Sequence, residues 1–435
     1  MLLALLLAAQ LTLPDGTPAL GQGHYRAWLD SPGGELPFGI EMNGEPGNWQ
    51  VHWINGEERI AVPETRWDHA TSELVFAMPH YDSEIRAQVS LEGSRLDGTW
   101  RKRRGLDRWV EMPFHAVAGK GHRFHPQPAR PGEQFDHDAT GNSNFEGRWA
   151  VQFESSEDLA VGVFEEGEDH RVQGTFLTTL GDYRYLAGRH DGPLLQLSCF
   201  DGAHAFLFRA TLSADRTLQG DFWSSDSWHE TWSATYSPNI SLPDSFDEVH
   251  WNPDIDLDTL RYPDADGRSR SLGDPQLRGK VTILSVFGSW CPNCNDEAVL
   301  WSELHARYAE RGLGIIGLAF ELTGEQERDR KQVARFRERH DLQYPVLLAG
   351  TADKTGAQKS FPAIDRIKSY PTAIFLDHEG NPRAIHSGFA GPATGKEHER
   401  LRAAYIDLIE TLLAEAEAAE ESAKVDGHTG ATQKD

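Results

Sequence analysis

The chain has 435 residues, more than a single compact core usually holds, so two or three domains are expected. Its formal net charge of −25 gives the surface a negative potential that repels phosphate backbones and anionic lipids, so we expect no nucleic-acid partner and no binding to membrane surfaces. Only three cysteines occur, which excludes a framework of several disulfides and suits a catalytic pair with one thiol left over.

Residues 1–19 are predicted to form a signal-like segment. The run LLALLLAAQLTL at residues 2–13 is too short to span a bilayer and is followed by the breaker PDGTP, so it resembles the hydrophobic region of a secretory signal. No Lys or Arg precedes the run, so either the true start lies upstream or the export signal is weak. We expect an extracytoplasmic protein, in the periplasm or cell envelope; an N-terminal strand or buried helix is the alternative.

Residues 20–245 are predicted to be β structure with an internal duplication. Short apolar and polar stretches alternate between Gly, Pro, Asp and Asn, as in antiparallel sheets. IRAQVS at residues 85–90 recurs as FRATLS at 208–213, and LDGTW at 96–100 recurs as LQGDF at 218–222, an offset of 123 or 122 residues. Each repeat, 20–118 and 146–245, has about eight strand-like runs, enough for a small antiparallel barrel or sandwich. Its interior either holds a ligand or, as is commoner when aromatic residues are frequent, is filled by side chains.

The segment between the repeats, residues 119–145, is rich in Gly and Pro and is predicted to be a solvated linker. It contains His122, His125 and His137 beside Asp residues, a weak candidate for a metal site. The linker interpretation is therefore preferred.

Cys199 is the cysteine that stands apart from the other two. It aligns with Phe76 of the first repeat and is in phase with Leu195 and Leu197 on one strand face. We therefore expect a small buried apolar side chain and not a reactive thiol.

From about residue 250 the pattern changes to alternating strands and helices, which predicts an α/β domain over residues 250–415. Residues 280–290 are a continuous apolar run, as in a strand buried on both faces, and residues 293–312 have helical spacing. Further strands are predicted at LGIIGLAFEL, YPVLLAG, PTAIFLD and PRAIHSGF, followed by an amphipathic helix. Residues 416–435 are predicted to be a fraying helix end and a disordered tail.

Cys291 and Cys294 stand at the junction of the predicted strand and helix, in the sequence GSWCPNCNDEA. A structural zinc site needs four ligands, and the nearest following histidine, His305, stands alone. A structural disulfide at this spacing closes a very small loop and removes little entropy from the unfolded chain. A redox couple uses every feature of the site, because the start of a helix favours an attacking thiolate at Cys291, and Cys294 is close enough to resolve a mixed disulfide. We predict redox chemistry with no metal and no cofactor.

Residues 250–415 resemble the TlpA/ResA/CcmG branch of the thioredoxin superfamily. The matching sequences are DADGRSRSL, LRGKVTILSVFGSWCPNC and SYPTAIFLDHEGNPRAIHSGFAG. The resemblance implies a thioredoxin-like fold and a cis peptide bond between Tyr370 and Pro371. The backbone of Tyr370 would then lie beside the cysteines, where an extended substrate can pair with it as an added strand. Trp290, Pro292, Tyr370 and Pro371 are the predicted substrate contacts.

The resemblance also points to an acid near Cys294. Thioredoxin has a buried Asp six positions before the first Cys, where this chain has Ser285. The TlpA-like branch has a Glu three positions after the second Cys, which is Glu297 here. The resemblance implies that Glu297 accepts or relays the proton of Cys294, although a Glu early in a helix is also favourable for the dipole alone. The dipeptide Pro-Asn differs from the Gly-Pro of thioredoxin and leaves the direction of electron flow open.

The preferred function is that of an extracytoplasmic thiol-disulfide oxidoreductase that reduces protein disulfides. The resemblance implies a membrane-embedded thiol electron donor, and disulfide-containing envelope proteins, such as immature c-type cytochromes, as substrates. The first alternative is a peroxiredoxin-like peroxidase on the same fold, although Gly288 stands where that family has Thr or Ser. The second is a ligand- or partner-binding role for the β half, with an accessory redox domain.

Overall fold

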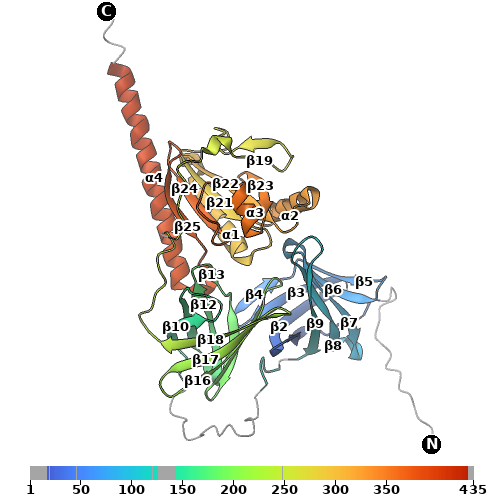
Figure 1. Ribbon diagram of the computed structural model, residues 1–435. Coiled ribbons are helices and arrows are strands. Elements are labelled where there is room, and N and C mark those ends of the chain that lie inside the picture. The colour runs from blue at the N-terminus through green and yellow to red at the C-terminus, as the bar shows by residue number, and fades with distance from the viewer. Residues whose placement is uncertain are drawn as a thin grey trace, which may run out of the picture. The chain divides into compact units, whose positions relative to one another are not determined.

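The computed structural model describes residues 17–429 except residues 19, 46, 120, 126–143 and 247. It divides into two compact units, and Figure 1 labels most of their helices and strands. The first, which we call the β unit, ends at Leu242 and lacks only the segment Thr179–Asp182. The second, which we call the α/β unit, contains that segment and the chain from Pro243 onward. The predicted signal-like segment lies almost wholly outside the described residues, and no helix within them is long and apolar enough to cross a bilayer.

The first repeat of the β unit forms a nine-stranded antiparallel sheet in the order β4-β3-β2-β1-β9-β8-β7-β6-β5. Burial alternates along these strands because successive side chains point to opposite faces, as in β1, where Tyr25, Ala27 and Leu29 are buried. The strands are β1 (Gly23–Ser31), β2 (Gly34–Glu45), β3 (Asn48–Asn55), β4 (Glu58–Ala61), β5 (Glu64–Asp68), β6 (Glu73–Met78), β7 (Ser83–Ser90), β8 (Arg95–Arg103) and β9 (Trp109–Ala118).

The second repeat also has nine strands, in the order β11-β10-β18-β17-β16-β15-β14-β12-β13. The strands are β10 (Gly147–Phe153), β11 (Ala160–Glu166), β12 (Arg171–Thr178), β13 (Gly181–Asp182), β14 (Leu186–Asp191), β15 (Leu194–Phe200), β16 (Ala205–Leu212), β17 (Thr217–Ser224) and β18 (Trp228–Tyr236). This sheet closes on itself, because β12 pairs with both β11 and β14. In the first repeat β3 pairs instead with β4, and the sheet ends in β4 on one side and β5 on the other. The predicted barrel or sandwich is therefore a closed barrel in repeat 2 and a sheet with two end strands in repeat 1.

Aromatic side chains fill the interior of the closed barrel. The ring of Phe176 lies 4.7 Å from that of Phe208 and 5.2 Å from that of Trp232. Cys199 is fully buried in the same core, as predicted, and burial raises the pKa of its thiol. Of the two predicted alternatives for the interior of this repeat, packing by side chains is the one observed.

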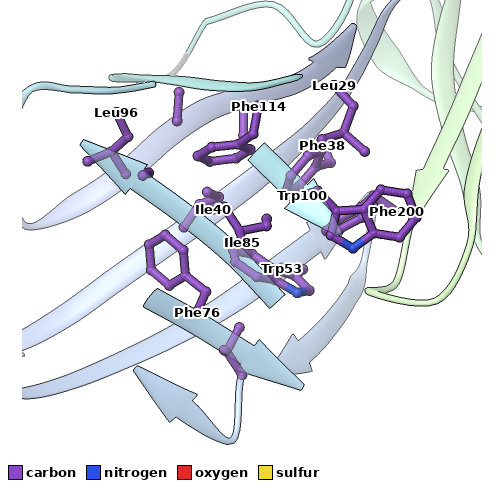
Figure 2. Close-up of a cluster of buried hydrophobic side chains, with 14 of the residues drawn as sticks. Leu29, Phe38, Ile40, Trp53, Phe76, Ile85, Leu96, Trp100, Phe114 and Phe200 are labelled. Carbon is purple, nitrogen blue, oxygen red and sulfur yellow. The ribbon is translucent and has the colours of Figure 1, made fainter. Parts of the chain in front are cut away.

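Phe200, the last residue of β15, belongs to the core of the first repeat. Figure 2 shows its ring among the side chains of that repeat. Its ring centroid lies 4.4 Å from that of Phe38 and 5.4 Å from that of Trp100. Because one apolar core includes residues of both repeats, the duplicated halves form a single compact unit.

The described start of the predicted linker is fixed to the first repeat at Arg123 and Phe124, whereas His122 and His125 are exposed. Phe124 is buried in the core of the first repeat, and Arg123 donates hydrogen bonds to the Ser198 Oγ at 3.0 Å and the Ile54 carbonyl at 3.1 Å. His137 lies outside the described residues. Within the described part of the chain, no three His, Cys, Asp or Glu side chains gather in a way that would hold a metal ion.

The α/β unit is built on a five-stranded sheet in the order β23-β22-β21-β24-β25. β21, β22 and β23 run parallel, whereas β24 pairs antiparallel with both β21 and β25. The strands are β19 (Arg261–Pro263) and β20 (Ser269–Ser271), which pair with each other, and β21 (Val281–Phe287), β22 (Leu313–Glu321), β23 (Val346–Thr351), β24 (Thr372–Leu376) and β25 (Pro382–Ser387). The helices are α1 (Pro292–Tyr308), α2 (Gln326–Arg339), α3 (Lys354–Ser360) and α4 (Lys396–Thr429). The predicted α/β thioredoxin-like fold is confirmed.

Strand β21 is buried along its whole length because both faces of the sheet are covered. Ile283 belongs to one core with Trp301 of α1 and Tyr405 of α4, whereas Leu284 belongs to the core on the other face with Ala357 of α3. The continuous apolar run in the sequence reflects this position between two layers. The cysteines follow it, just beyond the carboxyl end of this central strand.

Helix α4 continues past residue 415, so the prediction that the helix frays and gives way to a disordered tail from residue 416 is wrong for the part that the structure describes. Leu412, Leu413 and Ala416 are buried, and α4 lies alongside β24 and β25 in Figure 1. Further along, Glu417 pairs with Arg311 and Glu420 pairs with Lys280. Because Ala and Glu have high helix propensity, the composition that we interpreted as disorder supports a long helix.

Candidate active site

Cys291 and Cys294 lie where the chain passes from β21 into α1. Cys291 is the N-cap of α1, and its Sγ accepts a hydrogen bond from the Cys294 N–H at 3.4 Å. Pro292 is the first helical residue, a position where no backbone N–H is needed. The sulfur therefore takes the place of the usual cap oxygen, at the positive end of the helix dipole. Both cysteines are free thiols, with exposed fractions of 7% for Cys291 and 1% for Cys294, so Cys291 is the more accessible.

Cys291 also faces the loop that precedes β24. Its thiol donates to the Tyr370 carbonyl at 3.5 Å, and the peptide bond between Tyr370 and Pro371 is cis, as the resemblance implies. The ring of Tyr370 meets that of Trp290 edge to face with centroids 5.6 Å apart. Trp290 is held in turn by a hydrogen bond from its Nε1 to the Phe320 carbonyl at 2.9 Å. The structure thus brings three of the predicted residues, Trp290, Tyr370 and Pro371, together beside Cys291.

Gly288 makes room for this arrangement. A Cβ atom at residue 288 would lie 2.2 Å from the Trp290 Nε1, so any larger residue would displace the indole. The position at which peroxiredoxins carry Thr or Ser is therefore occupied here by a residue whose lack of a side chain is required for packing.

Pro292 and Asn293, between the cysteines, are buried. The Asn293 Nδ2 donates to the Asp182 carbonyl at 3.5 Å, and the Gly391 N–H donates to the Asp182 carboxylate at 2.7 Å. The segment Thr179–Asp182 of the α/β unit therefore lies against the residues of the cysteine motif, and the predicted substrate contact Pro292 is not at the surface.

Cys294 and Glu297 lie on the buried face of α1. Glu297 is 1% exposed and accepts hydrogen bonds from the Ser285 Oγ at 3.3 Å and the Tyr405 hydroxyl at 3.5 Å. Burial raises the pKa of Glu297 to about 7. Burial also raises the pKa of Cys294, to which the neighbouring Cys291 and the charge of Glu297 add. Ser285, at the position of the buried Asp of thioredoxin, thus helps to hold the carboxyl group that lies near Cys294.

Sequence reasoning missed a second buried carboxyl group near the cysteines. Glu321 is the last residue of β22, is 1% exposed and accepts hydrogen bonds from Ser289, two residues before Cys291. One signal in the sequence is the charged residue at the end of an otherwise apolar strand, because sites in α/β folds form at the carboxyl ends of parallel strands.

Comparison with known proteins finds matches in the α/β unit. A model of the AhpC/TSA family matches residues 252–385. The thioredoxin-like protein YneN of Bacillus subtilis is 32% identical over 148 residues, which cover 34% of this chain and 74% of that relative. The thiol-disulfide oxidoreductase ResA of Bacillus cereus is 29% identical over 119 residues, 27% of this chain and 59% of that relative. A secreted disulfide oxidoreductase of Mycobacterium tuberculosis, similar to DsbE of Escherichia coli, has 18% identity over 33% of this chain and 94% of its own, with a TM-score of 0.25.

The family model covers the part of the chain that carries the cysteine pair. The similarity to YneN covers most of that protein, and the thiols lie at the start of a helix that follows the central strand, beside a cis proline. Through its α/β unit, this chain belongs to the thioredoxin-like family of thiol-disulfide oxidoreductases.

Proposed function

We propose that this chain reduces disulfide bonds in proteins outside the cytoplasm, with Cys291 as the attacking thiolate and Cys294 as the resolving thiol. The observation that carries the proposal is the place of the Cys291 sulfur, within hydrogen-bonding distance of both the Cys294 N–H and the Tyr370 carbonyl. The Cys294 N–H is a donor for charge that develops on an attacking sulfur, and the Tyr370 carbonyl belongs to a backbone with which an extended substrate can pair.

In the first step the Cys291 thiolate attacks one sulfur of the substrate disulfide. A bond forms between the two sulfurs, and the other substrate sulfur leaves as a thiolate. The Cys294 N–H stabilises negative charge on the attacking sulfur, and the rings of Trp290 and Tyr370 provide apolar contacts for the substrate.

In the second step Glu297 takes the proton of Cys294, and the resulting thiolate attacks the Cys291 sulfur. The mixed disulfide breaks, the second substrate thiolate leaves, and a disulfide joins Cys291 to Cys294. Two electrons have then passed from the cysteine pair to the substrate, which leaves as two thiolates; the proton of Cys294 is held by Glu297, from which it passes to solvent, and the substrate thiolates take up protons from solvent. Glu297 suits this task because its pKa of about 7 lies near the working pH of a neutral compartment.

The family suggests where the electrons come from and where they go. We propose a membrane-embedded thiol donor that reduces the Cys291–Cys294 disulfide again, and disulfide-containing envelope proteins, including immature c-type cytochromes, as substrates. The apolar run at residues 2–13 supports export.

Single cysteine variants test the order of attack. With a disulfide-containing protein substrate, Cys294→Ser is expected to accumulate a mixed disulfide through Cys291, visible as a mass increase that a reductant reverses. Cys291→Ser is expected to form none, because the two remaining thiols, Cys199 and Cys294, are buried and have raised pKa values. The opposite pattern would reverse the assigned roles, and no adduct in either variant would refute the proposed exchange.

The equilibrium reduction potential of the couple tests the direction of electron flow. A value near the roughly −270 mV of thioredoxin is expected of a reductase, whereas a value near roughly −120 mV would identify an oxidant. The measurement is made against a glutathione or dithiothreitol buffer in a Cys199→Ala background.

A peroxidase on the same fold is the second candidate, because the AhpC/TSA family model matches residues 252–385. The helix N-cap position of Cys291 is compatible with attack on a peroxide, but Gly288 provides no hydroxyl at the place where peroxiredoxins have one. Peroxide consumption coupled to a thiol reductant, at a rate above that of Cys291→Ser, would favour this candidate.

A further inference from the structure

Glu321 places a carboxylate against the loop that carries the attacking cysteine. The residue ends β22, and its two carboxyl oxygens accept separate hydrogen bonds from Ser289, one from the backbone N–H at 3.0 Å and one from the Oγ at 2.8 Å. Ser289 is completely buried, so no solvent can replace these bonds if the carboxylate is removed.

The same loop is held from its other side by Asn295 of α1. Its Nδ2 donates to the Ser289 carbonyl at 3.1 Å and to the Cys291 carbonyl at 2.9 Å. Its Oδ1 lies 2.8 Å from the His340 Nε2, and burial lowers the pKa of His340 to about 4, so the neutral imidazole donates this hydrogen bond. The orientation of the Asn295 amide is thereby fixed.

Burying the charged form of Glu321 at the end of β22 costs free energy. Burial raises its pKa to about 7, and the nearby Asp329 adds to this, while the Ser289 donors and Arg328 oppose it. An apolar side chain would fill the end of β22 without that cost, but it would leave two Ser289 donors without an acceptor. The hydrogen bonds to the loop are therefore the feature that distinguishes Glu321 from a packing residue.

We propose that Glu321 is a positioning residue for the exchange reaction, which fixes Ser289 so that the Cys291 sulfur stays between the Cys294 N–H and the Tyr370 carbonyl. The proposal rests on the attacking role given to Cys291 above. The hydrogen bonds described for Glu321 do not reach that sulfur; Glu321 acts through Ser289, which Trp290 joins to Cys291.

The full-length chain provides the test, with the rate constant for reaction of the reduced protein with 5,5′-dithiobis(2-nitrobenzoic acid) measured per folded molecule. Glu321→Ala removes both acceptors, and the rate constant is expected to fall on the order of tenfold or more, because small displacements of a reacting atom have effects of this size. Glu321→Gln keeps the shape, and its amide can accept from the Ser289 N–H and donate to the Oγ, so it is expected to stay within about threefold of the unsubstituted chain. Ser289→Ala keeps one of the two hydrogen bonds and is expected to lie between these variants.

Glu327→Gln is the control, because it removes a carboxylate from the exposed face of α2 that pairs only with Lys331 in the described contacts of its side chain. Equal rates for Glu321→Ala and the unsubstituted chain would overturn the proposal. Equal slowing by Glu321→Ala and Glu321→Gln would overturn it too, since charge and not position would then be the cause. If Glu321→Ala does not fold, Ser289→Ala decides: slowing relative to Glu327→Gln supports the proposal, and an unchanged rate refutes it.

Cys291→Ser separates this proposal from the proposed function. If it abolishes the rapid reaction while the Glu321 and Ser289 variants react normally, only the positioning role fails. If Cys291→Ser reacts as fast as the unsubstituted chain, the attacking role of Cys291 fails instead.

Discussion

Glu297 combines burial with a titratable carboxyl group, so its protonation is linked to stability. Its pKa rises from 4.5 in an exposed setting to about 7 in the folded protein, chiefly because burial disfavours the charged form. The protonated form therefore stabilises the folded state below pH 4.5, and this stabilisation is lost as the pH rises to 7. One pKa unit corresponds to about 1.4 kcal/mol, so the linked change is on the order of 3 kcal/mol.

Glu297→Gln is expected to remove this dependence on pH. Relative to the unsubstituted chain, the variant should gain on the order of 3 kcal/mol in free energy of unfolding between pH 4 and pH 8, because Gln remains neutral throughout. Urea denaturation of both proteins at the two pH values measures the difference, and Glu327→Gln, on the exposed surface of α2, serves as the control. A difference that is the same at both pH values would show that Glu297 has the same pKa in the folded and the unfolded chain, and would contradict the raised pKa.

The cysteines, Glu297 and the cis proline were recognisable because each lies in a short motif or at a fixed distance from one. Glu321, Asn295 and His340 were not, because their roles arise only when β22 and the end of α2 come to lie beside the cysteine loop. Residues that support a site through the backbone of its loop leave a weak trace in a single sequence.

At the scale of elements, the constant offset between the β repeats was visible in their patterns of apolar residues, but closure of the sheets was not. β5 and β14 occupy matching positions in the two repeats. β14 pairs with β12 and so helps to close its sheet, whereas β5 is the last strand of its sheet. Pairing of edge strands depends on the course of the intervening chain, which the alternation of side chains does not specify.

Strand β15 connects the repeats through Phe200, which is fully buried in the first core although it belongs to the second repeat. Phe200→Ala is expected to lower the free energy of unfolding of the β unit by about 3 to 5 kcal/mol, through lost transfer energy and a cavity. Leu106→Ala, at a side chain that is 50% exposed, should change it by less than about 0.5 kcal/mol. Denaturant midpoints give both values; a cost below about 1 kcal/mol for Phe200→Ala would mean that the cores do not depend on this contact.

The long helix α4 has a buried part followed by an exposed part. Ile409, Leu412 and Leu413 are fully buried, whereas Glu420 takes part only in an exposed ion pair with Lys280 among its described contacts. Ending the chain after Ala419, which removes this ion pair, is expected to cost less than about 1 kcal/mol, because surface ion pairs contribute little. Leu412→Ala should cost about 2 to 5 kcal/mol by contrast. Equal losses in the two variants, measured by urea denaturation, would contradict this division of the helix.

At the scale of the whole molecule, each unit has its own hydrophobic cores, and the reactive thiols belong only to the α/β unit. Units with separate cores are expected to unfold in separate transitions. The single cysteine of the β unit, Cys199, is buried and has a raised pKa, so changes in redox state should leave that transition unaltered.

The transition of the α/β unit should therefore report the direction of electron flow. Folding and disulfide formation are linked in a thermodynamic cycle. If the couple is more reducing in the folded unit than in the unfolded chain, the disulfide raises the free energy of unfolding of the unit. The increase is about 1.4 kcal/mol for every 30 mV of difference between the two reduction potentials. Calorimetry of the oxidised and reduced chain is expected to show a higher Tm for the oxidised form in the transition of the α/β unit and the same Tm in that of the β unit. Cys294→Ser, which cannot form the disulfide, should show the same Tm in both conditions. A lower Tm on oxidation would indicate that the reduced form is stabilised, as in a disulfide-donating enzyme, and would contradict the proposed reductase.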